Sequence, residues 1–234
     1  MNSSRIIVSL DFPTAKEAHN LTRRLDPGHC RVKVGKELFT ISGPAFIETL
    51  VKAGFDVFLD MKFHDIPNTV AGACRSAAGL GVWMINLHVS GGRKMLEAGR
   101  EAVDKSGNRP LLIGVTVLTS LTSVDLNEIG VREDPGDLVL RLSRLAQSSG
   151  LDGVVCSPLE VSSLRKQFGN DFVLVTPGIR PQGTDRGDQQ RILTPSEAIS
   201  AGSDYLVIGR PITQAADPLQ ALMEIEEEIN AIAT

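Results

Sequence analysis

The sequence lacks the features of secreted, disulfide-stapled and membrane-spanning proteins. It has only three cysteines, Cys30, Cys74 and Cys156, which lie far apart and outside any CxxC motif. This excludes a disulfide framework and a zinc ribbon, and is typical of a reduced cytoplasmic protein. No apolar run approaches the ~18–20 residues of a membrane span. The N-terminal stretch has one arginine and no cleavage-site pattern, so we expect no secretory signal.

An excess of positive charge is also missing. The chain has 24 lysines and arginines against 28 aspartates and glutamates, a formal net charge of −4. Such a chain has no general attraction to nucleic acid or to an anionic membrane, so we expect neither as a partner. Any phosphate group that it binds must be held by a local cluster. The hydrophobic share of 42% is ordinary for a globular protein and argues against disorder.

Short apolar runs alternate along the chain with segments of helical spacing. The runs predict strands at residues 6–11, 31–35, 57–62, 84–89, 111–118, 152–156, 172–177 and 205–209. The segments between them predict helices at residues 15–25, 45–53, 69–80, 93–104, 138–148, 160–168, 195–201 and 219–232. Eight strand–helix units in series indicate an α/β fold, a closed (β/α)8 TIM barrel, with residues 1–234 as one domain. An open doubly wound sheet is the alternative, but residues 11–14 read DFPT where it usually carries a GxGxxG turn.

Charged side chains occupy the predicted carboxyl ends of three strands, which is where such barrels place their chemistry. Asp11, Lys33, Asp60 and Lys62 stand at these ends, and Asp65 follows in the next loop. Asp60 and Lys62 are two apart on one strand, so we expect their side chains to leave the same face ~6.5–7 Å apart. Unpaired buried charges are costly, so the alternating set indicates a common ligand and a lysine that donates a proton. The alternatives are a plain ion pair between Asp60 and Lys62, and Asp65 as the N-cap of the following helix.

A phosphate site is predicted after the last two strands. The polar stretch at residues 180–191 is too long for a tight turn, and the eighth strand ends in Gly209 and Arg210. Loops after strands seven and eight are the usual phosphate site of these barrels, and an arginine fork suits a phosphate dianion. A solvated glycine-rich loop is the alternative for residues 184–188, but it does not account for Gly209 and Arg210.

Residues 60–69 read DMKFHDIPNT, and this string resembles the signature of the orotidine 5′-phosphate decarboxylase family. Further matching segments are IVSLD at residues 7–11, KVG at 33–35, LTS at 118–120, PGIRP at 177–181 and VIGRPI at 207–212. The resemblance covers about residues 4 to 230. It implies a cofactor-independent decarboxylation of orotidine 5′-monophosphate to UMP and carbon dioxide, the last step of de novo UMP biosynthesis.

The resemblance also implies roles for the charged residues. Lys62 delivers the proton to C6 of the pyrimidine, and Asp60 lies against the departing carboxylate. Lys33 contacts the ribose and both carboxylates, and Asp11 binds a ribose hydroxyl. These roles agree with the physical chemistry, because a carbanion formed without a cofactor has to be stabilised electrostatically.

Further roles follow from the same resemblance. Asp65 and Thr69 serve the active site of the other subunit, which implies a homodimer. Thr119 corresponds to a residue at the pyrimidine edge, and Thr122 is a second candidate for that role.

The phosphate is held, by the same match, by Arg210 and Gly209, with Gln189 reaching over it and Arg180 nearby. A closing loop then lets binding energy at the phosphate drive assembly of the site.

Two other functions compete with this interpretation. Metal-dependent phosphosugar enzymes of the same superfamily carry a magnesium-binding glutamate on the second strand, where this chain has Lys33. His64 and His88 lie near the mouth, but Lys33 and Lys62 would repel a cation there, so we expect no metal site. A barrel that only binds phosphate is the other alternative. The intact set of charged residues argues against it, since a pure binder gains nothing from a carboxylate that faces an anionic ligand.

Overall fold

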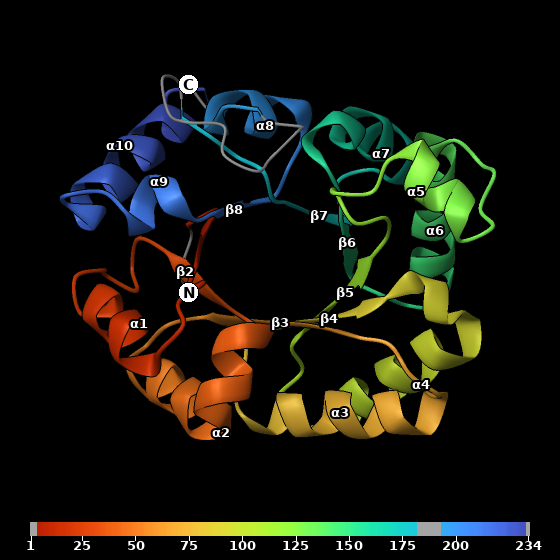
Figure 1. Ribbon diagram of the computed structural model, residues 1–234, viewed down its shortest axis with the longest axis horizontal. Coiled ribbons are helices and arrows are strands. Elements are labelled where there is room, and N and C mark those ends of the chain that lie inside the picture. The colour runs from red at the N-terminus through yellow and green to blue at the C-terminus, as the bar shows by residue number, and fades with distance from the viewer. Residues whose placement is uncertain (1–3, 182–192, 233–234) are drawn as a thin grey trace.

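The computed structural model describes residues 4–181 and 193–232, in which eight parallel strands close into a barrel surrounded by helices (Figure 1). The strands are β1 (Ile6–Ser9), β2 (Arg31–Gly35), β3 (Val57–Phe63), β4 (Met84–His88), β5 (Leu111–Val115), β6 (Gly153–Val155), β7 (Val173–Thr176) and β8 (Tyr205–Ile208). The helices are α1 (Ala15–Thr22), α2 (Lys36–Lys52), α3 (Pro67–Gly79), α4 (Arg93–Asp104), α5 (Ser123–Glu128), α6 (Pro135–Ser148), α7 (Val161–Phe168), α8 (Pro195–Ala201), α9 (Arg210–Thr213) and α10 (Pro218–Asn230), with single 3-10 turns at Val89–Gly91 and Pro158–Glu160. The strands pair in chain order, and β8 pairs with β1. The predicted (β/α)8 barrel is confirmed.

Two apolar clusters hold the barrel together. One consists of buried strand residues only: Ile7, Phe58, Met84, Ile113, Val175 and Val207. The neighbours of Ile7, Ile6 and Val8, belong to a larger cluster that includes helix residues. Because successive side chains of a strand point to opposite faces, the first cluster fills the barrel and the second lies between strands and helices.

The second helix differs most from the prediction. α2 begins directly after β2, at Lys36, and not at residue 45. The helix is broken at Gly43, which has a φ of 64°. Pro44 has no N–H to donate and restricts the residue before it, so the chain bends there and continues as helix. The glycine and proline therefore mark a bend inside a helix, where the sequence pattern placed the start of one.

Two short helices, α5 and α9, were not predicted. The N-cap of α5 is Thr122, which forms a capping box with Asp125, and α9 starts at Arg210. β5 is shorter than predicted and ends at Val115, because the chain then turns, with the Leu121 N–H donating to the Leu118 carbonyl at 2.9 Å. Both short helices follow the carboxyl ends of strands, so they shape the mouth of the barrel.

The amino-terminal end of the barrel carries an arginine stacked on aromatic rings. The Arg31 guanidinium lies 4.4 Å from the centre of the Trp83 ring and 5.0 Å from that of Tyr205. Its Nε is 3.3 Å from Asp56 Oδ2. Such cation–π contacts contribute about 0.5–2 kcal/mol each. This end of the barrel therefore serves stability, as is usual for the amino-terminal face.

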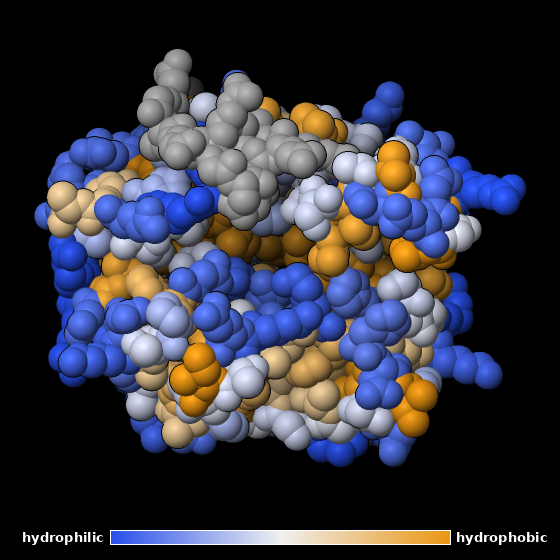
Figure 2. Space-filling view, in the orientation of Figure 1, coloured by the Kyte–Doolittle hydropathy of each residue, from blue (hydrophilic) through white to orange (hydrophobic). Residues whose placement is uncertain are grey.

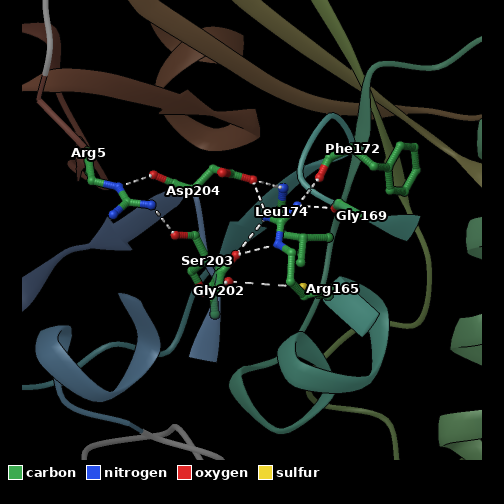
Figure 3. Close-up of polar contacts among 10 residues, drawn as sticks. Arg5, Arg165, Gly169, Phe172, Leu174, Gly202, Ser203 and Asp204 are labelled. Carbon is green, nitrogen blue, oxygen red and sulfur yellow. Dashed lines mark hydrogen bonds and ion pairs between the residues drawn. The ribbon is translucent and has the colours of Figure 1, made fainter. Parts of the chain in front are cut away.

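A second cluster at this end joins the last two strands to α7. Asp204 Oδ2 accepts a hydrogen bond from the Leu174 N–H at 2.7 Å and lies 2.6 Å from Arg165 Nη2. Arg165 also donates to the Gly202 carbonyl, and Arg5 donates to the Asp204 carbonyl (Figure 3). The backbone groups where β7 and β8 begin are thus bonded to side chains, which anchors the strands that carry the predicted phosphate site.

The three cysteines belong to the larger apolar cluster. All three are buried and free of disulfide bonds. Burial raises the pKa of the Cys74 thiol to about 12, so it stays protonated at neutral pH. Within residues 4–181 and 193–232, no helix combines the length and the apolar character needed to cross a bilayer.

Candidate active site

Polar side chains from adjacent strands meet at the carboxyl end of the barrel. Ser9 ends β1 and Asp11 follows it, while Lys33 lies on β2 and Asp60 on β3. The strand register places Ser9 beside Lys33 and Gly35 beside Asp60. Because parallel strands end at the same edge of the barrel, residues about 50 positions apart in the chain become neighbours.

These side chains form a continuous chain of ion pairs with alternating charge. Lys33 Nζ lies 3.1 Å from Asp11 Oδ1 and 3.4 Å from Asp60 Oδ2. Lys62 Nζ lies 2.5 Å from Asp60 Oδ1. The side chains of Lys33 and Asp60 are each only 10% exposed, against 26% for Lys62 and 65% for Asp11. The structure thus brings four of the five predicted charged residues together, with the middle two buried.

Asp60 remains ionised despite its burial. Burial by itself raises the pKa of this carboxyl group, but the Lys33 and Lys62 ammonium groups lower it, and so do hydrogen bonds from Lys62 and Asn86. The net effect is a pKa below the ordinary value for aspartate. A second carboxylate brought against Asp60 will therefore meet a negative charge.

The backbone at Lys62 departs from the predicted extended strand. Its φ of 53° is the only positive value at a non-glycine residue in the described part of the chain. The register between β3 and β4 shifts here, with residues 60–62 opposite residue 86; the flanking pairs are Leu59 with Ile85 and Phe63 with Leu87. The expectation that Asp60 and Lys62 project at regular strand spacing is therefore wrong. Their side chains meet because the backbone turns, and a left-handed conformation costs a residue with a Cβ about 1–2 kcal/mol.

Asp65 and Thr69 lie apart from this chain of ion pairs. Both are exposed, around the start of α3, and Asp65 Oδ1 accepts a hydrogen bond from the Ile66 N–H at 2.6 Å. No ion pair of Asp65 occurs within residues 4–181 and 193–232. The alternative role of Asp65 as a helix N-cap is wrong, because Ile66 is the N-cap residue and no side chain caps it.

A cavity of about 620 Å³ lies beside the ion pairs and extends to the last strands. Asp11 and Lys33 line it on the side of β1 and β2, and Arg180, Gly209 and Arg210 line it on the side of β7 and β8. In the space-filling view the centre of the molecule is recessed, with hydrophilic residues along one side and hydrophobic residues at its depth (Figure 2). The cavity therefore suits a ligand with hydroxyl groups at one end and an anionic group at the other.

The residues predicted to hold phosphate differ in their surroundings. Arg210 is exposed as the first residue of α9, and Gly209 is the N-cap of that helix. Arg180 is buried, and its backbone N–H donates to the Leu193 carbonyl at 3.0 Å. It therefore reaches the cavity from a fixed backbone. Gln189 lies outside the described residues.

The two candidate threonines are distinguished by their hydrogen bonds. Thr122 is exposed, and its Oγ1 lies 2.7 Å from Asp125 Oδ2 within the capping box of α5. These bonds lower the pKa of the Asp125 carboxyl group. Thr119 lies half-buried in the turn after β5. Neither threonine is among the described residues that line the 620 Å³ cavity.

A second cavity, of about 390 Å³, is lined mainly by apolar residues of α5, α6 and the segment after β5, together with His64 and His88. The two imidazole rings have centres 5.5 Å apart. Burial lowers the pKa of His88 to about 4, with further contributions from His64, Lys36 and Lys62, so His88 is neutral at neutral pH. In the part of the chain that the structure describes, no group of three or more histidine, cysteine, aspartate or glutamate side chains is arranged to hold a metal ion.

Two polar residues of this site, Ser9 and Asn86, were not predicted from the sequence. Ser9 Oγ donates to Asp11 Oδ2 at 2.7 Å, and Asn86 contacts both Asp60 and the Lys62 backbone. A signal for Asn86 was present, because it is an amide within an otherwise apolar strand, and a buried amide requires partners. The sequence pattern did not say which partners these are.

Comparisons with known proteins agree with the geometry. The family model described as "Orotidine 5'-phosphate decarboxylase / HUMPS family" matches residues 4–225. A relative named orotidine 5′-phosphate decarboxylase from Hydrogenovibrio crunogenus is 59% identical over 225 residues, which are 96% of this chain and 95% of the relative. A relative of the same name from Glaesserella parasuis is 58% identical over 227 residues, 97% of this chain and 99% of the relative. The crystal structure of orotidine 5′-phosphate decarboxylase from Lactobacillus acidophilus matches with a TM-score of 0.87 at 39% identity, covering 97% of this chain and 99% of that one.

Proposed function

Since this chain belongs to the orotidine 5′-phosphate decarboxylase family, we propose that it converts orotidine 5′-monophosphate to UMP and carbon dioxide, with Lys62 as the proton donor and no metal or cofactor. This reaction is the last step of UMP biosynthesis. The observation that carries the proposal is the alternating ion-pair chain of Asp11, Lys33, Asp60 and Lys62 beside a cavity that reaches Arg210.

In the proposed reaction, the bond between C6 and the carboxyl carbon breaks and its electron pair stays on C6. The pyrimidine ring delocalises this charge poorly, so a fixed cation beside C6 has to stabilise it. The Lys62 ammonium group provides that cation and then transfers a proton from Nζ to C6, which yields UMP. The resulting amine regains a proton from water. Enzymes supply ~8–23 kcal/mol in total, and a decarboxylation without a cofactor requires the upper part of that range.

The other charged residues prepare this step. The ionised Asp60 lies against the substrate carboxylate, and their repulsion is relieved when carbon dioxide leaves. Lys33 contacts the ribose and offsets the negative charge of Asp60 and of the substrate carboxylate. Asp11 binds a ribose hydroxyl. The burial of Lys33 and Asp60 supports these roles, because electrostatic interactions are stronger where water is excluded. The two lysines also disfavour a divalent cation at the same place.

The phosphate and the base occupy opposite parts of the site in this proposal. Arg210 and Gly209 bind the phosphate, with Arg180 and Gln189 assisting, and Thr119 contacts the pyrimidine edge. The cavity lining supports the arginine roles. The engagement of the alternative threonine in the capping box of α5 favours Thr119.

We also propose that the protein is a homodimer in which Asp65 and Thr69 complete the partner's site. Both residues are exposed in one subunit, and Asp65 forms no ion pair among the described residues. Ile66 beside them is 66% exposed, and a partner subunit that covers Asp65 and Thr69 would also cover this apolar side chain.

Three broader expectations belong to the same proposal. The whole chain, residues 1–234, forms one barrel domain, which is supported by the closure of β1 against β8. The protein is cytoplasmic, in keeping with three free cysteines. With a net charge of −4 it binds neither nucleic acid nor a membrane.

The reaction is tested by mixing EDTA-treated protein with orotidine 5′-monophosphate, following the loss of ultraviolet absorbance and identifying UMP as the product. Lys62→Ala should still bind UMP but lose turnover. Near-wild-type turnover of this variant would refute the proton-donor role. Tight UMP binding without turnover by the unaltered chain would indicate a binding protein. If neither is seen, phosphosugars with magnesium are the next substrates to test.

The shared site has its own test. Lys62→Ala and Asp65→Ala dimers should each be inactive. In the first dimer both active sites lack Lys62, and in the second both lack Asp65. Subunit exchange between them should restore part of the activity, since a hybrid dimer contains one intact site. A mixture that exchanges subunits, shown by mass spectrometry, and stays inactive would contradict the shared site.

A further inference from the structure

Asn86 is a buried amide at the centre of the register shift between β3 and β4. It is 0% exposed, and it stands between Ile85, which pairs with Leu59, and Leu87, which pairs with Phe63. It therefore faces residues 60–62, whose regular pairing with β4 is interrupted. A buried amide without hydrogen bonds is unfavourable, so its polar atoms need partners at this position.

Both ends of the amide are bonded to the charged residues. Asn86 Oδ1 accepts a hydrogen bond from the Lys62 backbone N–H at 2.7 Å, and Nδ2 donates to Asp60 Oδ1 at 2.7 Å. The same Asp60 oxygen lies 2.5 Å from Lys62 Nζ. A backbone N–H can only donate and an ionised carboxylate can only accept, so the amide has a single workable orientation. The three residues thus form a closed ring of hydrogen bonds.

This ring acts on the least favourable part of the backbone. Lys62 has a φ of 53°, a conformation that a side chain with a Cβ rarely adopts. Such strain persists only where the surroundings hold it in place. The bond from the Lys62 N–H to Asn86 replaces a strand-to-strand bond and fixes the direction in which the Lys62 side chain leaves the backbone.

We propose that Asn86 is a positioning residue for decarboxylation, which holds the Lys62 backbone in its left-handed conformation and orients the Asp60 carboxylate toward Lys62 Nζ. The inference rests on the proposed function, because it assigns Asn86 to the alignment of the proton donor. A side chain that only completes the register shift would contribute to stability and leave turnover per folded site unchanged. The two roles therefore differ in what a substitution does to kcat.

Asn86→Ala tests the proposal directly. We expect a loss of about 100-fold or more in kcat, because small misplacements of catalytic groups have effects of this size. KM and the affinity for UMP should change less than about threefold, since bound UMP does not require the proton transfer. Turnover is measured per folded site, with the number of sites counted by UMP titration.

Asn86→Asp is a variant of nearly the same size that separates the two hydrogen bonds. It keeps the acceptor for the Lys62 N–H but places a carboxyl group against Asp60. Lys33 and Lys62 favour its ionised form, but Asp60 already occupies these two cations. We therefore expect burial and the Asp60 charge to prevail and to hold the pKa of the introduced group above the usual value of about 3.9. Below its pKa the group carries a proton and can donate to Asp60 as the amide does. The kcat relative to wild type should therefore rise as the pH falls from about 8 to about 5, whereas the ratio for Asn86→Ala should not.

The other titratable groups around this position are Asp11, which reaches the cluster through Lys33, and His88, at the end of β4. Both are present in the wild type and in both Asn86 variants, so neither distinguishes Asn86→Asp from Asn86→Ala.

Val103→Ala in α4 is the matched control for a general loss of packing. Val103 is buried away from the charged cluster, so this variant should lower the melting temperature and leave kcat per folded site unchanged. If the wild type does not decarboxylate the substrate, the proposed function fails. If the wild type is active and both Asn86 variants keep kcat within about threefold, the positioning role is wrong. An equal loss of kcat and UMP affinity in Asn86→Asp at every pH would also overturn it, because it would indicate a disrupted site.

Discussion

Lys62 is the proposed proton donor, and it is also the only non-glycine residue with a positive φ in the described part of the chain. Backbone strain and side-chain charge at this position can be measured separately. Lys62→Gly and Lys62→Ala both remove the ammonium group and its 2.5 Å contact with Asp60. They differ only in the presence of a Cβ at a φ of 53°. Any difference in stability between them therefore reports the backbone conformation at this position and not the ion pair.

The expected difference follows from two opposing terms. A Cβ in the left-handed region costs about 1–2 kcal/mol in the folded state, which favours glycine. Glycine loses more backbone entropy on folding, which favours alanine by about 0.4–1 kcal/mol. The folded-state term is the larger, so Lys62→Gly should be more stable than Lys62→Ala by about 1 kcal/mol. For a chain of 234 residues this corresponds to about 2–4 °C in melting temperature.

The assay is urea denaturation of both variants at equal protein concentration, which matters if the protein is a dimer. Both variants should lack turnover and should give the same m-value. A Lys62→Ala variant more stable than Lys62→Gly would refute the assignment of strain to this position.

Three further predictions concern other parts of the molecule. Arg210→Ala should weaken UMP binding by about 2–5 kcal/mol and leave uridine affinity nearly unchanged, as measured by calorimetry; an equal loss for both ligands would mean that the phosphate contact is misassigned. Gly153→Ala should destabilise the fold by about 3 kcal/mol or more, because the added Cβ would lie 2.0 Å from a carbonyl oxygen of β7. Gly107→Ala is the control, because a Cβ there meets nothing within 4 Å, and this variant should unfold at a urea concentration close to that of the wild type. The hydrogen bond and the charge of Glu226 raise the pKa of His29. This partly exposed pair should therefore contribute about 0.2–1 kcal/mol to the free energy of unfolding below pH ~6.5 and lose that contribution as the pH rises through the raised pKa. A Glu226→Gln variant should therefore melt below wild type near pH ~5.5 and equally at pH ~8.5, and a constant difference would exclude this titration.

The barrel itself could be predicted from the sequence because its determinants are local. Apolar runs bounded by helix signals define strand–helix units, and eight such units in series leave few topologies. Because parallel strands end at one edge, the same reasoning predicted that Asp11, Lys33, Asp60 and Lys62 would lie together. The sequence pattern did not show which of these side chains are in contact, or that Asp65 lies apart from them.

The details that decide the chemistry depend on pairing between strands that are distant in the chain. The left-handed turn at Lys62 and the burial of Asn86 arise from the shifted register of β3 against β4, and the pKa of Asp60 depends on charges from β2 and β3 together. Helix periodicity likewise could not show that Thr122 is occupied by a capping box. The sequence by itself determined the architecture and the strand ends that carry charge. Only the tertiary structure decided the orientation of each charge, because a register shift and the hydrogen bonds that satisfy it exist only once the two strands are paired.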